Sequence, residues 1–487
     1  MARFIGLDIG TSAVKAVLVD EAQAVLAEAA EPLATERPRP LWSEQHPDAW
    51  WRAVATVLDR LAALAPLAEV AAIGLSGQMH GAVLLGADLK PLRPAILWND
   101  GRAFAEAAAL NADHPGLAAI VGVPAMAGFT APKLAWLARH EPPVRAGLKV
   151  ALSPKDYLRL VLTGELATDL SDAAGTWWLD EARRDWCDAA LAACGLDRSF
   201  MPRLVEGTVA TGSVRAELGR RWGLPPGVIV AAGAGDTAAG AIGVGVVAEG
   251  TAVASLGTSA NLLAATACYR PDPGRLVHAF CHALPGRWFQ MAAMLNGASC
   301  LSWAASLVGA DVATLVAEAE AAYAGPGDLV FLPYLAGERT PHDDPHARGA
   351  FFGLTAASDR RALVQAVLEG VAFTFADAVD CIAATGTPLG EIAAVGGGAR
   401  SDLWMRILAS VVDRPILRHR GGDKGPAFGA ARLARLALTG EAPEAVCAAP
   451  PILDRMEPEP GLAAAYRPRL ARFRRLYAAV REEFRPL

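Results

Sequence analysis

Two things are scarce in this sequence: lysine and regularly spaced cysteine. Only six of the 45 basic residues are Lys, and the net charge is −6, so no part of the chain carries the basic excess typical of nucleic-acid binding. The seven cysteines are scattered without a C-x-x-C pair, a pattern that indicates free thiols in a reducing compartment. We therefore expect no nucleic-acid partner and no disulfide framework.

The N-terminus also lacks the apolar core of a signal peptide, since it reads MARFIGLDIG. Together with the free thiols, this predicts a cytoplasmic protein. A chain of 487 residues is too long for a single core, and its length predicts roughly two to four domains. Hydrophobic residues at 53% and charged residues at 20% are typical of an ordinary globular protein.

Two common nucleotide-binding motifs are missing as well. No G-x-x-x-x-G-K-[ST] occurs, which excludes a P-loop enzyme. The run GGGAR at 396–400 lacks the full dinucleotide spacing and has no obvious acidic residue about 20 positions later, so a Rossmann site is disfavoured.

The most apolar stretch, residues 227–248, contains a single charged residue, Asp236. It is long enough to cross a membrane, but its six glycines weaken a helix, and its charge would lie near the centre of a bilayer, where a charge is most costly. We therefore expect a buried strand followed by a helix and no contact with a membrane. Asp236 then either caps that helix or serves as a catalytic carboxylate in a dry cleft.

Strands and helices alternate along the chain, which predicts α/β architecture. The segment IGLDIGTSAVKAVL at 5–18 resembles AVASLGTSANLLAA at 252–265, and each reads as strand, G-T-S turn and strand. The echo predicts two similar domains, at residues 1–246 and 247–487.

Three glycine loops follow predicted strands: DIGTS at 8–12, SLGTS at 255–259 and VGGGARS at 395–401. Each one taken alone is often only a tight connection. Together they place backbone N–H groups and hydroxyls at strand ends, which is how an anion cradle forms without lysine. Asp8 would repel a phosphate there unless Mg²⁺ lies between them, although an Asp that only forms the turn is the alternative.

Polar residues also follow an earlier strand. SGQMHG at 76–81 holds Met79 and His80 between glycines, which suits a polar ligand, whereas a lone His after a strand is usually structural. LWNDGR adds an aromatic wall and a polar cluster typical of sugar sites: Trp98, Asn99, Asp100 and Arg102.

These motifs, with SPKDYLRLVLTGE, SDAAGT, GAGDTAAG, LPYLAGERTPHDDP and GGDKGPAFGAA, occur in an order that resembles the FGGY family of carbohydrate kinases over essentially the whole chain. The resemblance implies two ribonuclease-H-like domains of the actin/hexokinase ATPase type that flank a central cleft. The N-terminal domain would bind mainly the sugar and the C-terminal domain mainly ATP. The motifs are most similar to those of family members that phosphorylate D-xylulose to D-xylulose 5-phosphate.

The resemblance also implies a role for each site residue. Asp236 is the expected catalytic base, and Asp8 the carboxylate near Mg²⁺, which it would hold directly or through water. The expected sugar contacts are Met79, His80, Trp98, Asn99, Asp100, Arg102 and Thr237. The expected ATP contacts are Gly10, Thr11, Ser12, Gly257, Thr258, Gly397, Gly398 and Asp402.

One residue departs from the family pattern. Members that act on D-xylulose usually have Asn after the catalytic Asp, and here Thr237 stands there. The alternatives are therefore an FGGY kinase for another sugar, such as D-ribulose, and, in a different class, a non-catalytic actin-like ATPase module. The family loosely suggests a homodimer.

Overall fold

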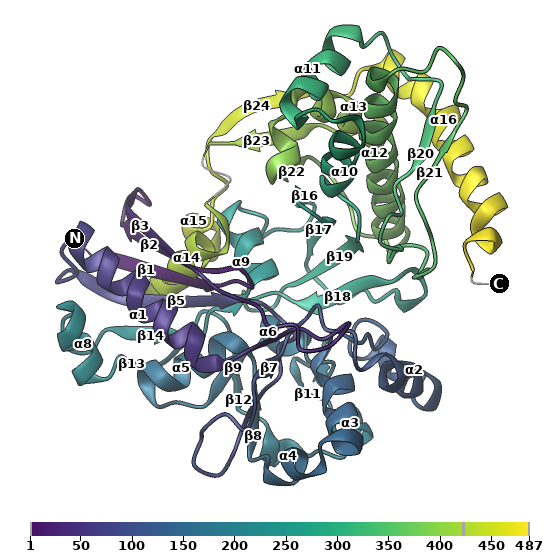
Figure 1. Ribbon diagram of the computed structural model, residues 1–487. Helices are drawn as coiled ribbons and strands as arrows, with labels where there is room; N and C mark the ends of the chain where they lie inside the picture. Colours follow the sequence, from purple (N-terminus) through teal and green to yellow (C-terminus); the bar gives the residue numbers. More distant parts are fainter. Residues whose placement is uncertain (1, 421–423, 486–487) are drawn as a thin grey trace.

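The structure is a computed structural model that describes residues 2–420 and 424–485 (Figure 1). The beginning of the GGDKGPAFGAA motif, residues 421–423, and the outermost residues of the two predicted domains lie outside the described residues.

The first sheet is built around β1 (Arg3–Ile9), which pairs antiparallel with β2 (Ala13–Asp20) and parallel with β5 (Val70–Gly77). Its apolar side chains alternate between two buried faces, as expected for a strand covered on both sides. The sheet is completed by β3 (Val25–Pro32), β13 (Ala210–Ser213), β14 (Ile229–Ala231) and β15 (Ala234–Gly235).

The second sheet repeats this arrangement. β16 (Ala252–Leu256) pairs antiparallel with β17 (Ala260–Thr266) and parallel with β22 (Ile392–Val395). The sheet also contains β18 (Val277–Cys281), β19 (Trp288–Met294), β23 (Ile416–His419) and β24 (Ile452–Met456).

Each sheet therefore contains an antiparallel meander of strands, β1–β2–β3 in the first sheet and β16–β17–β19 in the second. The first strand of each meander, β1 or β16, also pairs with a parallel strand. The two G-T-S turns join the first two strands of each meander. This is the duplicated ribonuclease-H-like arrangement that the sequence echo predicts, and the predicted fold class is confirmed.

Helices cover both faces of the first sheet. α1 (Pro47–Leu64) packs on the face that carries Ile5 and Leu7, and α14 (Gly425–Thr439) packs on the opposite face. α14 approaches closely because Gly6 has no side chain: a Cβ there would lie 1.8 Å from the carbonyl oxygen of Ala427. In sequence α14 lies between β23 and β24 of the second sheet, yet it packs on the first sheet (Figure 1), and the domain boundary after residue 246 stays a prediction.

The core of the second half is formed by α12 (Arg360–Ala384), which lies against β17, β19 and β20 (Val330–Leu332). Among the described helices, only α12 is by itself long and apolar enough to span a membrane. However, 83% of its most apolar window is buried inside the protein, as in a core helix. The C-terminal helix α16 (Pro460–Val480) docks on the second half through Tyr466, Phe473 and Tyr477.

The apolar stretch 227–248 is not one helix. It contains β14, β15 and the short helix α9 (Asp236–Gly243), and it confirms the predicted strand and helix.

A long insertion separates β5 from β13 and supplies the lower lobe in Figure 1. Its helices are α2 (Phe104–Asp113), α3 (Thr130–His140), α4 (Pro142–Gly147), α5 (Pro154–Thr163), α6 (Leu170–Ala174) and α7 (Asp188–Ala193). Its strands are β6 (Val83–Leu85), β7 (Ala95–Ile96), β8 (Val150–Leu152), β9 (Ala167–Asp169), β10 (Leu179–Asp180), β11 (Asp185–Trp186) and β12 (Arg203–Val205), and β7 pairs with β4 (Glu44–Gln45).

The remaining elements flank the two sheets: α8 (Ala216–Trp222), α10 (Ser299–Val308), α11 (Val312–Ala322), β21 (Ala350–Phe352), α13 (Asp402–Val412) and α15 (Pro443–Val446).

Candidate active site

Asp236 is the first residue of α9, at the carboxyl end of the first sheet. Three parallel strands bring their ends together here, because Asp8 of β1 is in register with Ser76 of β5, and Ser76 with Ala234 of β15. The residue at the helix cap is Gly235, and no side chain makes a capping hydrogen bond. The capping role considered for Asp236 is therefore wrong, and its carboxylate is free for another task.

The electrostatic surroundings of Asp236 suit a base. Burial, and then the negative charges of Asp8 and Asp172, raise the pKa of Asp236 to about 7, while hydrogen bonds from Thr237 oppose the shift. The Thr237 hydroxyl lies 3.3 Å from Oδ1 of Asp236. A carboxylate with a pKa near 7 can accept a proton at neutral pH far better than an ordinary aspartate.

Asp8 is buried beside it. Its Oδ1 accepts a hydrogen bond of 3.0 Å from the Ser76 hydroxyl, and among the described residues no hydrogen bond reaches Oδ2. Burial raises the pKa of Asp8 to about 6, against the lowering effects of Ser76 and of the charge of Lys15. Two neighbouring carboxylates that both resist ionisation fit a site for a divalent cation, which would relieve both.

The sugar-loop candidates lie against the turn that precedes Asp236. Met79 is buried and touches Gly235, where a Cβ would lie 2.7 Å from Cγ of Met79. His80 has a left-handed backbone (φ 67°), and its ring stacks on Phe129 with 4.5 Å between the ring centroids. SGQMHG and Asp236, far apart in sequence, are thus brought together.

The ring of His80 has a defined tautomer. Its Nδ1 lies 2.6 Å from the carbonyl oxygen of Gly175, which can only accept, so Nδ1 carries the hydrogen. Burial lowers the pKa of His80 to about 3, which keeps the ring neutral. Nε2 is then an acceptor, and within the described residues it has no hydrogen-bond partner.

The cluster Trp98, Asn99, Asp100 and Arg102 divides into two parts. Trp98 and Asn99 are exposed, whereas Asp100 and Arg102 form a buried ion pair of 2.7 Å that also includes Glu44. The Arg102 guanidinium lies over the ring of Trp42, 3.6 Å from its centroid. The first two side chains are available to a ligand, and the other two are held by each other.

Thr11 connects the first phosphate-loop candidate to the sugar loop. Its hydroxyl accepts a hydrogen bond of 2.8 Å from Nε1 of Trp98 and donates one of 3.0 Å to Gln78. Its side chain is therefore occupied by the sugar-side residues. Gly10 and Ser12 lie on either side of it in the β1–β2 turn.

A cavity of ≈ 830 Å³ extends from Asp236 into the second half of the chain, and its size suits a nucleotide. α9 contributes Asp236, Thr237, Gly240, Ala241 and Val244 to its wall. The facing wall includes Val253, Ser255, Asn261, Leu263, Gly396, Gly397, Arg400, Arg418, His419 and Arg420.

The two glycine loops of the second half lie next to each other at this cavity. A Cβ on Gly396 would lie 3.1 Å from the backbone nitrogen of Gly257. Gly397 lines the cavity, Gly398 packs under it against Trp404, and Thr258 is exposed. Asp402 is instead ion-paired with Arg418 at 2.6 Å and is not part of the wall.

Two family models match the chain. The N-terminal domain of the FGGY family of carbohydrate kinases matches residues 3–243, and the C-terminal domain of that family matches residues 252–438. The chain belongs to the FGGY family of carbohydrate kinases.

Similar proteins of known name cover nearly the whole chain. It is 48% identical to the xylulose kinase of Escherichia coli (strain K12) over 477 residues, which is 97% of this chain and 98% of that one. It is 47% identical to the xylulose kinase of Klebsiella pneumoniae over 480 residues, 98% and 99% of the two chains. The crystal structure of a xyloylose kinase from Brucella ovis has a TM-score of 0.96 at 49% identity and covers 99% of each chain.

The predicted family is thus confirmed, and this FGGY kinase is an enzyme. Several cavity residues were missed by the sequence reasoning, above all Ser255, Asn261, Arg418 and Arg420. Ser255 and Asn261 alternate with apolar residues in β16 and β17, so a period of two could have marked them once the cleft-facing side was known. The arginines carry no such signal.

Proposed function

We propose that this FGGY kinase transfers the terminal phosphoryl group of ATP to the 5-hydroxyl of D-xylulose, which yields D-xylulose 5-phosphate and ADP. One observation carries the proposal: Asp236, a carboxylate with a raised pKa, stands between the Met79–His80 loop and the nucleotide-sized cavity. The xylulose kinases that are almost half identical over their full length support the choice of sugar.

Asp236 acts as the general base. Its carboxylate accepts the proton of the sugar hydroxyl as that oxygen bonds to the terminal phosphorus, and the bond from this phosphorus to the bridging oxygen of ADP breaks. The position of the carboxylate at the start of α9 favours its charged form through the helix dipole, which partly offsets burial.

The sugar is held by the loop that touches the turn before Asp236. Nε2 of His80 accepts a bond from a sugar hydroxyl, and Met79 forms an apolar wall. Trp98 and Asn99 contact the sugar from the exposed side, with Thr237 beside the base. Asp100 and Arg102 are paired with each other, so they contribute by holding the loop of Trp98 and Asn99 in place and not by contacting the sugar.

ATP occupies the cavity, with its phosphates at Gly397 of the wall, at the adjacent loop of Gly257 and Thr258, and near the turn of Gly10, Thr11 and Ser12, while Gly398 supports Gly397 from beneath. Asp402 contributes indirectly, because it holds Arg418 in the wall. Asp8 would hold Mg²⁺, directly or through water. When bound, the ion would neutralise charge on the phosphate oxygens.

Two alternative functions predict different results in a sugar-dependent assay of ADP release. Another FGGY substrate such as D-ribulose remains the nearer one, because Thr237 replaces the usual Asn. A non-catalytic ATPase module is disfavoured by the carbohydrate-kinase matches over both halves. A cytoplasmic location, a homodimer and the lack of nucleic-acid or membrane partners stay predictions.

A coupled ADP-release assay across D-xylulose, D-ribulose, aldopentoses and glycerol tests the proposal. We expect kcat/KM to be highest for D-xylulose, with D-ribulose second. If another sugar ranks first, the assignment of D-xylulose as the substrate is wrong, but the protein is still a sugar kinase. If no sugar raises ADP release, the class itself fails.

The Asp236→Asn variant tests the base. The amide is nearly isosteric but cannot take the proton, and loss of a general base costs about 10²–10⁴ in rate. Binding of ATP, measured by calorimetry, should be unchanged. A variant that keeps more than about a tenth of the wild-type kcat would contradict the role of Asp236.

A further inference from the structure

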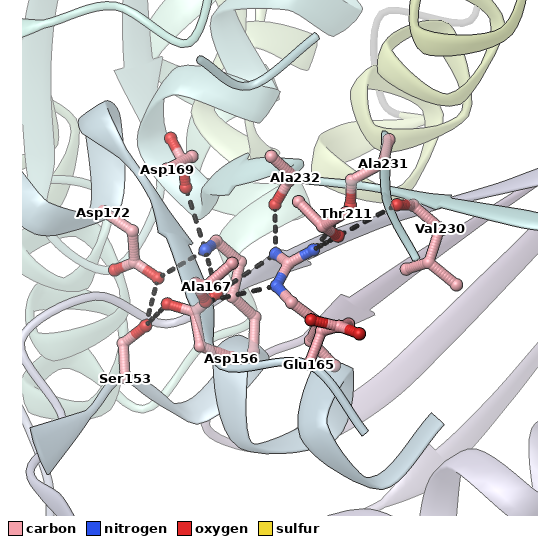
Figure 2. Close-up of polar contacts among 12 residues, drawn as sticks. Ser153, Asp156, Glu165, Ala167, Asp169, Asp172, Thr211, Val230, Ala231 and Ala232 are labelled. Atoms are coloured by element: carbon pink, nitrogen blue, oxygen red, sulfur yellow. Dashed lines mark hydrogen bonds and ion pairs between the residues drawn. The ribbon is translucent and has the colours of Figure 1, made fainter. Parts of the chain in front are cut away.

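A fully buried cluster of charges lies between α5 and α6, and Figure 2 labels its aspartates, Asp156, Asp169 and Asp172. Nζ of Lys155 is 2.6 Å from Asp156, 2.8 Å from Asp169 and 3.2 Å from Asp172, and none of these side chains is exposed. Arg159, one turn further along α5, lies 3.1 Å from Asp156. Buried ion pairs of this kind contribute little net stability and are costly when incomplete, so stability alone is a poor reason for the cluster.

Arg159 connects the cluster to the strand that leads to Asp236. Its guanidinium donates to the carbonyl oxygens of Ala231, at 2.9 Å, and Ala232, and also to the Thr211 hydroxyl at 2.6 Å (Figure 2). Ala231 is the last residue of β14. The chain is thus fixed at Ala231 and Ala232, five and four residues before Asp236.

A second connection runs through α6. The Asp169 carboxylate, held by Lys155, accepts a hydrogen bond of 2.8 Å from the backbone N–H of Ser171 and another from its hydroxyl. The Ser171 oxygen in turn accepts a hydrogen bond of 3.1 Å from the backbone N–H of Gly235. Gly235 is the residue directly before Asp236, so Ser171 holds the peptide from which the base projects.

The opposite end of α6 holds the sugar loop. Gly175, which follows α6, accepts the hydrogen bond from Nδ1 of His80. α6 is only five residues long. The end near Ser171 contacts the turn before Asp236, and the end near Gly175 contacts the sugar loop. Lys155 also packs against Gly77, at the start of the sugar loop, where a Cβ would lie 3.1 Å from its Cβ.

We propose that Ser171, itself held by Asp169 and Lys155, is a positioning residue for Asp236 and fixes the base through the N–H of Gly235. The inference rests on the proposed role of Asp236. Ser171 touches neither substrate in this scheme. It acts through Gly235, because a base that moves by about 1 Å loses a large part of its rate.

The test compares two buried serines of the same neighbourhood. Ser171→Ala removes the acceptor for the Gly235 N–H. Ser153→Ala is the matched control, because the Ser153 hydroxyl bonds to Asp156 and Asp172, at 2.7 and 2.5 Å, but not to the Asp236 turn. Both variants lose buried hydrogen bonds, so both should lower Tm.

We expect kcat of Ser171→Ala with D-xylulose to fall on the order of 10- to 100-fold, while KM for ATP stays within about 2-fold. Ser153→Ala should retain kcat within about 2-fold. If the two variants lose kcat equally, or if Ser171→Ala loses only Tm, Ser171 is merely structural and the proposal fails. If Ser171→Ala does not fold, Ser171→Cys takes its place, because it keeps the shape of serine with a weaker acceptor. It should likewise lower kcat and leave KM for ATP unchanged.

Asp236→Asn in the same assay separates this inference from the proposed function. If Asp236→Asn is active, the base assignment has failed. If Asp236→Asn is inactive and Ser171→Ala has the kcat of the Ser153→Ala control, the positioning role alone has failed.

Discussion

Nδ1 of His80 and the carbonyl oxygen of Gly175 are 2.6 Å apart, and this contact determines what the ring offers to a ligand. The nitrogen that faces the carbonyl must carry the hydrogen, and the low pKa keeps the ring neutral. The other nitrogen, Nε2, is therefore a fixed acceptor. A sugar hydroxyl that donates to it is distinguished from an epimer that cannot, because the epimer leaves a buried group unpaired.

Replacement of His80 by Asn should isolate this acceptor. Asn tolerates the left-handed backbone at this position, and its amide can still donate to Gly175. It lacks an atom equivalent to Nε2, so we expect kcat/KM for D-xylulose to fall about 10- to 100-fold, as for a lost hydrogen bond to a buried group. KM for ATP should not change. An equal loss for ATP would indicate damage to the whole site and would contradict a specific sugar contact.

Asp236→Asn should stabilise the protein at high pH while it removes activity. The pKa of Asp236 is raised to about 7, so the folded state holds a proton that the unfolded state has lost, and stability falls as pH rises from about 4 through 7. At pH 8 the neutral amide avoids the burial cost and the repulsion by Asp8 and Asp172. Tm of the variant should then exceed wild type by about 1–2 °C, as for roughly 1 kcal/mol in a chain of this length.

At pH 5 this difference should be clearly smaller than at pH 8, because only the first part of the stability loss between about pH 4 and pH 7 has then occurred. Calorimetric scans at both pH values check the pattern. Asp88→Asn is the control, since Asp88 is exposed and should show no change in Tm at either pH. A Tm gain that is equal at pH 5 and pH 8 would mean that the charge of Asp236 is not its cause.

The sequence was informative where chemistry is local. The D-I-G-T-S and S-L-G-T-S turns predicted the duplicated meander because glycine and small hydroxyl residues between two apolar runs allow few other structures. The isolated charge of Asp236 in an apolar stretch predicted a special site for the same reason. The structure adds that Gly235, not Asp236, stands at the helix cap.

The rest depends on tertiary contacts that no local pattern carries. Asp100 and Arg102 looked like ligands in sequence, yet they pair with each other because Glu44 and Trp42 come from a distant segment to enclose them. Thr11 reads as a phosphate-loop hydroxyl, but its single O–H donates to Gln78, and its oxygen accepts a hydrogen bond from Trp98. The position of α14 on the first sheet likewise depends on Gly6, whose role appears only when the helix is in place.

The dependence of activity on pH should report Asp236. The base must be deprotonated, so kcat/KM for the sugar should rise with pH through an apparent pKa of about 7. The charged groups that act on Asp236 are Asp8 from β1 and Asp172 from α6. Asp172 is itself surrounded by Lys155 and Asp156 of α5 and by Asp169, and burial raises its own pKa to about 7.

Asp172→Asn should therefore move the acid limb of this profile to lower pH. The substitution removes a negative charge near Asp236, and a like charge raises the pKa of a carboxyl group. It also leaves two carboxylates opposite Lys155 and Arg159, so the variant should fold. Profiles of kcat/KM from pH 5 to 9 measure the effect. An acid limb that stays in place would show that Asp172 has no electrostatic influence on the base.

Thr237→Asn should sharpen the preference for D-xylulose over D-ribulose. Thr237 lines the cavity, with its hydroxyl 3.3 Å from the Asp236 carboxylate, and a longer amide at this point would extend toward the sugar. With Thr, the space leaves room for an epimer or for a bridging water. One added hydrogen bond to a single epimer is worth about 1 kcal/mol, so the ratio of kcat/KM values should rise about 5- to 10-fold. Thr237→Ser, which keeps the hydroxyl and adds no amide, is the control and should leave the ratio unchanged. If Thr237→Asn leaves the ratio as it is in the wild type, the choice between the two sugars is made elsewhere, and His80→Asn becomes the variant in which to look for it.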